Sequence, residues 1–133
     1  MKDALLQVSR TIAAAGASNS STGIDIGARE TPNGITPPQV EGEVIIPTVT
    51  GLANAATLTV TVEHSDDDST YTSVGQGNPV FVLTGAGGVG ATGYTARFRL
   101  LPTAKRYIRV STAVSAAGGT LTSLSVTLSI VIP

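Results

Sequence analysis

The chain has 133 residues, 13% of them charged, with a net charge of −1, one histidine and no cysteine. Without cysteine there can be no disulfide, thiolate metal site or cysteine nucleophile, and His64 alone does not suffice for an ordinary zinc site. A near-neutral charge gives no basic surface for phosphate groups, so nucleic acid is not an expected partner.

The N-terminal third contains one short strand between two irregular segments, and we predict a single domain over residues 1–133. Residues 1–15 are expected to be an arm or an edge segment, because their apolar residues fit neither the helical nor the strand period. Polar residues interrupt that apolar run, so we expect no signal peptide and no export, and no stretch is long enough to span a membrane. A strand around Ile24 and Ile26 precedes a long exposed loop at 28–42, which contains Asn33-Gly34 and Pro37-Pro38.

The middle of the chain holds the clearest alternation. A strand is predicted over 44–49, where Pro47 indicates an edge position or a bulge. In residues 56–63, Leu58, Val60 and Val62 share one face and threonines share the other, which is typical of a strand with one buried side. Asp66 to Asp68 then turn the chain.

The remaining strands are predicted over 71–74, 80–83, 94–101, 106–115 and 124–132, separated by glycine or proline turns. In residues 94–101 the face of Tyr94, Ala96 and Phe98 is expected to point inward. About eight strands without a helix predict an all-β, single-domain antiparallel β-sandwich. Jelly-roll and immunoglobulin-like topologies fit this strand pattern equally well.

Three motifs are candidate sites of chemistry. The triplet Asp66 to Asp68 lacks the ligand spacing of a calcium loop, so we interpret it as a solvated turn. The glycine-rich segment 85–93 lacks the lysine and the following helix of a phosphate-binding loop, and we interpret it as a flexible connection. His64, at a strand end, is expected to be a surface residue. We therefore predict no enzyme, catalytic residue, metal, cofactor or small-molecule substrate.

One local basic cluster stands out. On alternating strands, Arg97, Arg99 and Arg109 are predicted to share an outward face, where they either form salt bridges between subunits or are simply solvated. The few aromatic residues weaken a carbohydrate-binding interpretation.

Three segments in this order give the chain a family resemblance: LLQVSRTIAAAGASNSSTGIDIG, ATLTVTVEHSDDDSTYTSV, and ARFRLLPTAKRYIRVSTAVSAAGGTLTSLSVTLSIVI. The pattern resembles the Bbp16-like capsid cement, or decoration, proteins of tailed bacteriophages. The resemblance implies a jelly roll on the outer surface of a phage head that joins major capsid protein subunits and self-associates as a homodimer or homotrimer.

A cement role would place protein contacts on the arm, the proline loop and the basic cluster. The predicted interface residues are Leu5, Leu6, Val8, Pro37, Pro38, Arg97, Arg99 and Arg109. Two other classes stay open: a receptor-binding module of a tail fibre or baseplate, and a small carbohydrate-binding module.

Overall fold

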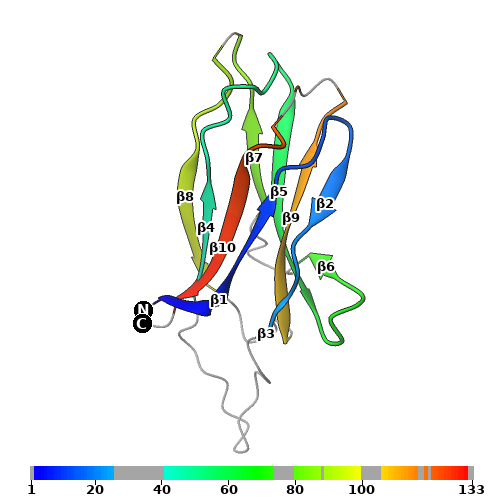
Figure 1. The fold of residues 1–133 in the computed structure, drawn as a ribbon, viewed down its shortest axis with the longest axis vertical. Coiled ribbons are helices and arrows are strands. Elements are labelled where there is room, and N and C mark those ends of the chain that lie inside the picture. The colour runs from blue at the N-terminus through cyan, green and yellow to red at the C-terminus, as the bar shows by residue number, and fades with distance from the viewer. Residues whose placement is uncertain are drawn as a thin grey trace, which may run out of the picture.

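The computed structural model describes residues 2–25, 41–73, 80–87, 89–99, 106–116, 119 and 121–131, and within these ranges the chain is all-β (Figure 1). The strands form two antiparallel sheets that pack face to face as a sandwich. In chain order they are β1 (Lys2–Thr11), β2 (Ser18–Ser20), β3 (Ile24–Asp25), β4 (Glu41–Ile46), β5 (Thr57–Ser65), β6 (Thr72–Ser73), β7 (Val80–Thr84), β8 (Tyr94–Arg99), β9 (Tyr107–Val114) and β10 (Ser125–Val131).

The order of the strands is that of a jelly roll. The first sheet runs β1-β10-β4-β8, and the second runs β2-β9-β5-β6, with β3 also paired to β9 and β7 also paired to β5. We count β2 and β3 as one interrupted strand, and β6 and β7 as another, which leaves eight strand positions. Numbered in chain order, these positions give the sheet orders 1-8-3-6 and 2-7-4-5. This double Greek-key order distinguishes a jelly roll from an immunoglobulin-like sandwich. The two interruptions explain why ten strands are found where about eight were predicted.

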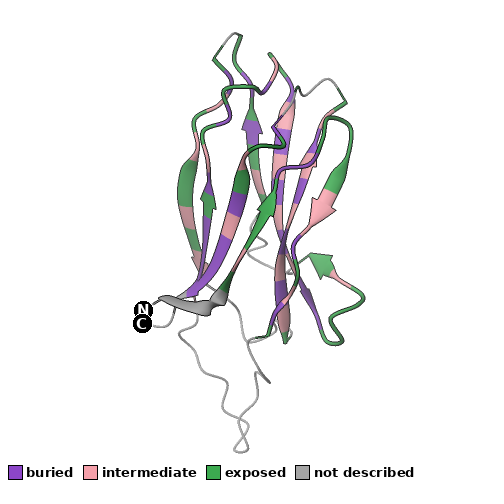
Figure 2. Cartoon of the chain, in the orientation of Figure 1, coloured by how far each residue is buried: buried purple, intermediate pink, exposed green. Residues whose placement is uncertain are grey.

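The core lies between the two sheets and follows the predicted alternation (Figure 2). Leu58, Val60 and Val62 of β5 are fully buried, while the intervening residues are partly exposed. The same pattern holds in β9, where it buries Ile108 and Val110. Burying a side chain of this kind contributes roughly 1.5–3 kcal/mol, so these two central strands carry much of the stability of the second sheet.

The structure corrects three predictions around β4. The strand ends at Ile46, so Pro47 lies beyond it, and β4 is an interior strand between β10 and β8 and not an edge. The edge assignment for Pro47 was wrong because a proline just past the last ladder residue removes no ladder donor. Residues 41–42 belong to β4, so the predicted loop 28–42 extended too far; residues 26–40 lie outside the described ranges.

A glycine in β4 makes room for an aromatic ring from β8. Gly42 pairs with Phe98, and a Cβ atom placed on Gly42 would lie 2.1 Å from the Phe98 ring. The ring therefore covers the glycine, an arrangement that fills the space a side chain would otherwise take.

The glycine-rich segment after β7 is docked against the chain, which corrects its interpretation as a flexible connection. Ala91 exchanges two backbone hydrogen bonds with Val49, at 2.9 and 3.1 Å. At Gly90, φ is +67° and an added Cβ would lie 2.0 Å from the Val49 carbonyl oxygen, so only glycine fits there. The glycines thus allow close backbone contact with residues 47–54.

Candidate interaction surfaces

The described surface is distinguished by one apolar edge and two charged faces. Within the described ranges, no cluster of three or more possible metal ligands is found, and no helix is long and apolar enough to cross a membrane.

The apolar edge is formed by β7 at the side of the second sheet. Val80 and Val82 are 44% and 55% exposed, because their registers with Thr61 and Thr59 of β5 place them on the outer face of that sheet. Val89 and Tyr94, in the connection to β8 and at its start, are also exposed. Large apolar residues that gather on an outer surface mark binding sites more often than single scattered ones do.

The directions of the β7 backbone groups follow from the hydrogen bonds of Gly85, the residue after the strand. The N–H of Gly85 donates to the Ala56 oxygen at 2.9 Å, and the Gly85 oxygen accepts from the N–H of Ala55 at 2.9 Å, so Gly85 points toward β5. Since backbone polar groups alternate in direction along a strand, Leu83 also points toward β5. The N–H and C=O groups of Val80, Val82 and Thr84 then point away from it. No strand pairs with this side of β7 among the described residues.

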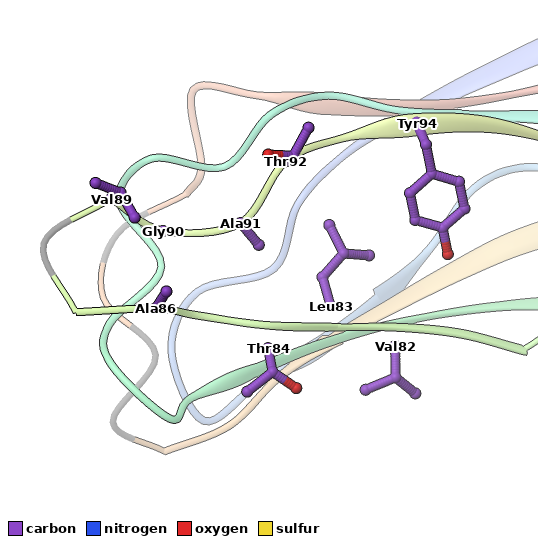
Figure 3. Close-up of a pocket in the computed structure, with 9 residues that line it drawn as sticks. All are labelled: Val82, Leu83, Thr84, Ala86, Val89, Gly90, Ala91, Thr92 and Tyr94. Atoms are coloured by element: carbon purple, nitrogen blue, oxygen red, sulfur yellow. The ribbon is translucent and has the colours of Figure 1, made fainter.

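A hollow of about 470 Å³ lies beside this edge, between β7 and the start of β8 (Figure 3). The Leu83 and Tyr94 side chains point into it, whereas Val82 and Thr84 point to the opposite face of β7. Tyr94 also contacts Phe81 edge-to-face, with the ring centroids 6.2 Å apart. Tyr94 was predicted to face inward, and it lies on the inner side of β8 at the open rim, where it stays 42% exposed.

Charged side chains of β4 and β8 pair on the outer face of the first sheet. Arg97 of β8 donates from Nε to Oε2 of Glu43 on β4 at 3.0 Å, and its Nη1 lies 4.0 Å from Glu41. The Glu43 side chain is only 4% exposed, while that of Arg97 is 58% exposed. A carboxylate this buried needs its cation, so Arg97 already has a structural role within the subunit.

A second charged cluster lies on the outer face of the other sheet. Arg109 donates to Glu63 at 2.8 Å, and its guanidinium lies 3.9 Å from the centre of the Tyr71 ring. The Tyr71 hydroxyl donates to Asp68, and partial burial together with this hydrogen bond holds the pKa of Tyr71 well above its usual value. Arg109 is thus held from two sides by its own chain.

Arg106 forms a further ion pair, with Asp25 of β3. Two hydrogen bonds, of 2.9 and 2.8 Å, join the guanidinium to the two carboxylate oxygens. This bidentate bond raises the pKa of Arg106 above its usual value. The guanidinium also lies 5.2 Å from the centre of the Tyr107 ring, so arginines cover the faces of both Tyr71 and Tyr107.

The basic residues predicted to share one face do not share it. Arg97 and Arg99 lie on β8 in the first sheet, and Arg109 lies on β9 in the second, so Arg97 and Arg109 belong to opposite outer faces. The prediction failed because the connection between β8 and β9 crosses from one sheet to the other.

The other predicted interface residues are only partly described. Val8 is partly buried and packs against the core. Leu5 and Leu6 belong to β1, which forms an edge of the first sheet, but their side chains lie outside the described part of the structure. Pro37 and Pro38 also lie outside it.

His64 and the acidic turn have structural surroundings. His64 is 8% exposed, so its assignment as a surface residue was wrong: it sits on the inner face of β5 with Val62. In the turn, Asp67 accepts hydrogen bonds from the backbone N–H groups of Thr70 and Ser69 and from the Ser65 hydroxyl. These bonds lower the pKa of Asp67 to about 2.

Sequence reasoning missed the apolar edge, although two signals were present. The run Val80-Phe81-Val82-Leu83 does not alternate, so both faces of this strand are apolar even though it lies in a sheet with one exposed face. In addition, no charged residue occurs between Asp68 and Arg97.

Comparison with known proteins reveals the fold and no family. No protein-family profile matches the sequence, and no curated protein matches it. Among solved structures, the chain is similar to the PBSX exported protein XepA, with a TM-score of 0.50, 17% identity, and coverage of 98% of this chain and 39% of XepA. A structure of infectious bursal disease virus, Gt strain, gives a TM-score of 0.41 at 18% identity, with 93% of this chain and 27% of the viral chain covered. The chain thus spans well under half of either protein, and at these identities the likeness to XepA concerns the fold alone.

Proposed function

We propose that the protein is a non-catalytic structural component of a phage virion, specifically a cement protein on the outer surface of the head. In this role it binds the major capsid protein and other copies of itself, as a dimer or a trimer. It needs no cofactor, metal, nucleic acid, membrane or small-molecule substrate.

The observation that carries the proposal is the jelly-roll strand order, β1-β10-β4-β8 facing β2-β9-β5-β6. It is the fold that the sequence resemblance to phage cement proteins implies, and it spans the same three segments that carry the resemblance. The PBSX exported protein XepA is similar to this chain in fold.

The surface chemistry also suits a protein that works by contact. Arg97, Arg106 and Arg109 each form an ion pair with a carboxylate of their own subunit. These arginines are therefore already engaged, and an apolar edge is left for a partner. In a symmetric shell, many weak contacts of this kind add up, because each bound subunit raises the effective concentration of the next contact.

Single-particle imaging of assembled virions tests the proposal directly. We expect density for the sandwich over the seams between capsid subunits. Density confined to a tail fibre or baseplate would instead assign the protein to the receptor-binding class.

Binding to purified heads gives a second test. The protein should co-sediment with heads that lack it and raise the temperature at which they break open. Binding to a glycan array but not to heads would contradict the cement role and favour a carbohydrate-binding module. Removing residues 1–12 is a poor variant here because it deletes β1 from the first sheet. Charge reversal at the exposed Arg10 probes the same surface without this loss.

A further inference from the structure

We propose that β7 is a pairing edge for a second copy of this chain, so that two β7 strands join antiparallel across a two-fold axis and extend the second sheet through both subunits. The inference rests on the geometry and composition of this edge alone, and it stands whether or not the virion role is correct.

The first observation is that the edge is ready to pair. The N–H and C=O groups of Val80, Val82 and Thr84 point away from β5, and no described strand takes them up. A row of unpaired backbone groups is a template for another strand. Antiparallel pairing with an identical strand is what a two-fold axis produces, and it matches the antiparallel pairing throughout this fold.

The second observation is that the side chains fit a copy of themselves. If Val82 lies on the two-fold axis, it faces Val82 of the second copy, and Val80 faces Thr84 of the second copy on the same outer surface. In this register the backbone groups of Val80, Val82 and Thr84 that point away from β5 meet those of the second copy, so the pairs Val82–Val82 and Val80–Thr84 each exchange two hydrogen bonds. On the inner surface Phe81 faces Leu83 of the second copy. Pairs of side chains that face one another across antiparallel strands stabilise the pairing by packing together.

The third observation is the absence of charge. A two-fold contact places each residue against its own patch, so a charged residue near the axis meets a like charge. No charged residue occurs between Asp68 and Arg97, a range that includes β7 and the connection to β8. The edge strand β1 carries Lys2, Asp3 and Arg10. Self-complementarity in charge is thus a property of β7 and not of every edge.

Two five-residue strands bury a small area, so we expect a weak dimer whose population depends on concentration. Sedimentation velocity over the micromolar to millimolar range should show monomers passing to dimers. Hydrogen exchange should slow at the amides of Val82 and Thr84 as the concentration rises, while the Leu83 amide, which faces β5, stays equally protected.

Val82→Lys places two ammonium groups against each other and should weaken the dimer about tenfold or more. Val82→Glu should do the same. Because residue 82 faces itself, a mixture of the two variants should associate as a mixed dimer more tightly than either variant alone, as opposite charges now meet. Ile45→Lys is the matched control: Ile45 is exposed, but on the interior strand β4, so its dimer constant should equal that of the unaltered chain.

Circular dichroism of each variant shows that it is folded, so that a loss of association is not a loss of structure. The proposal is overturned if the unaltered chain stays monomeric throughout, if folded Val82→Lys associates as well as Ile45→Lys, or if the mixture of oppositely charged variants gains nothing. A particle of three copies would also overturn it, since a two-fold strand pair closes at two.

Discussion

Two edge strands of the sandwich, β1 and β7, are built differently. The edge strand β1 carries Lys2, Asp3 and Arg10, and its pairing with β10 shifts register between Lys2 and Gln7. The edge strand β7 has no charge and no such shift, and it exposes Val80 and Val82. Charged residues and irregular pairing are the usual means by which a soluble protein prevents its edge strands from joining those of other molecules.

The difference indicates that β1 is protected against pairing with another chain and that β7 is not. β8, on the same side of the molecule as β7, also carries arginines, and the uncharged edge strand β2 is only three residues long. Very short edge strands are themselves a protection against pairing, so β7 is the strand without one of these devices. A protein that places these devices on β1 and β8 but omits them from β7 has a use for that strand, and pairing is the use its exposed groups allow.

The largest expected effect comes from comparing a β7 residue whose backbone groups face β5 with one whose backbone groups face away from it. Leu83→Pro removes a buried side chain and a donor that faces β5, so we expect it to lower the free energy of unfolding by about 4 kcal/mol. Val82→Pro removes a donor that faces outward and should cost less than about 1 kcal/mol in the monomer. Urea unfolding at a concentration where the protein is monomeric measures both. Equal losses would show that the assigned direction of the β7 backbone groups is wrong.

The next effect concerns the charged edge strand β8. Arg97→Ala leaves the buried carboxylate of Glu43 without this arginine, and we expect a loss of about 2 kcal/mol, less than for a fully buried pair because Arg97 is largely exposed. Arg10→Ala on β1 is the control and should change stability by less than about 0.5 kcal/mol. Adding Glu43→Gln to Arg97→Ala should recover part of the loss. If the Arg97 and Arg10 variants are equally stable, the charge on β8 protects an edge without supporting the fold.

A smaller effect is expected from making β1 resemble β7. Arg10→Val should leave unfolding within about 0.5 kcal/mol of the unaltered chain but raise its tendency to associate. The gain should be smaller than the loss caused by Val82→Lys, because the shifted register of β1 interrupts the template. Sedimentation velocity measures both changes in association, the gain for Arg10→Val and the loss for Val82→Lys. A gain as large as that loss would mean that the lack of charge alone, and not the regular geometry of β7, determines association.

The smallest effect lies where β5 turns into β6, on the same side of β5 as β7. The pKa of Asp67 is lowered to about 2 from 3.8. Its contribution to stability is therefore complete above about pH 4 and is lost as the pH falls toward 2. Asp67→Asn keeps an acceptor oxygen but removes the charge, so the melting temperature should fall less steeply between pH 4 and 2 than in the unaltered chain. Identical slopes would show that the turn does not titrate with folding.

The sequence was sufficient to predict the strands and their buried faces wherever alternation was regular. Leu58 and Val60 on β5 and Val110 on β9 were assigned to the core from period alone, because a side chain on a pleated strand has only two directions to choose from. Alternation does not say to which sheet a strand belongs. For this reason Arg97 and Arg109 were placed together, although they lie on opposite faces.

The candidate edge was harder to predict than the core. The apolar run at Val80 to Leu83 is equally typical of a strand buried on both faces, and only the pairing of β7 with β5 on one side shows that it is exposed. The burial of His64 was missed for a related reason: its place beside acidic residues suggested solvent, but its alternation with Val62 places it on the inner face.

The pairing of the first strand with the last has a consequence for how the chain is made. Thr11 pairs with Ser125, so β1 leaves the ribosome long before its partner β10 exists. At roughly 5–20 residues per second, the delay is on the order of ten seconds. When β10 is made, β5, β7 and β9 of the second sheet have already been synthesised, while the first sheet still lacks the strand that joins β1 to β4. Synthesis of β10 therefore sets the moment at which β1 can join the first sheet.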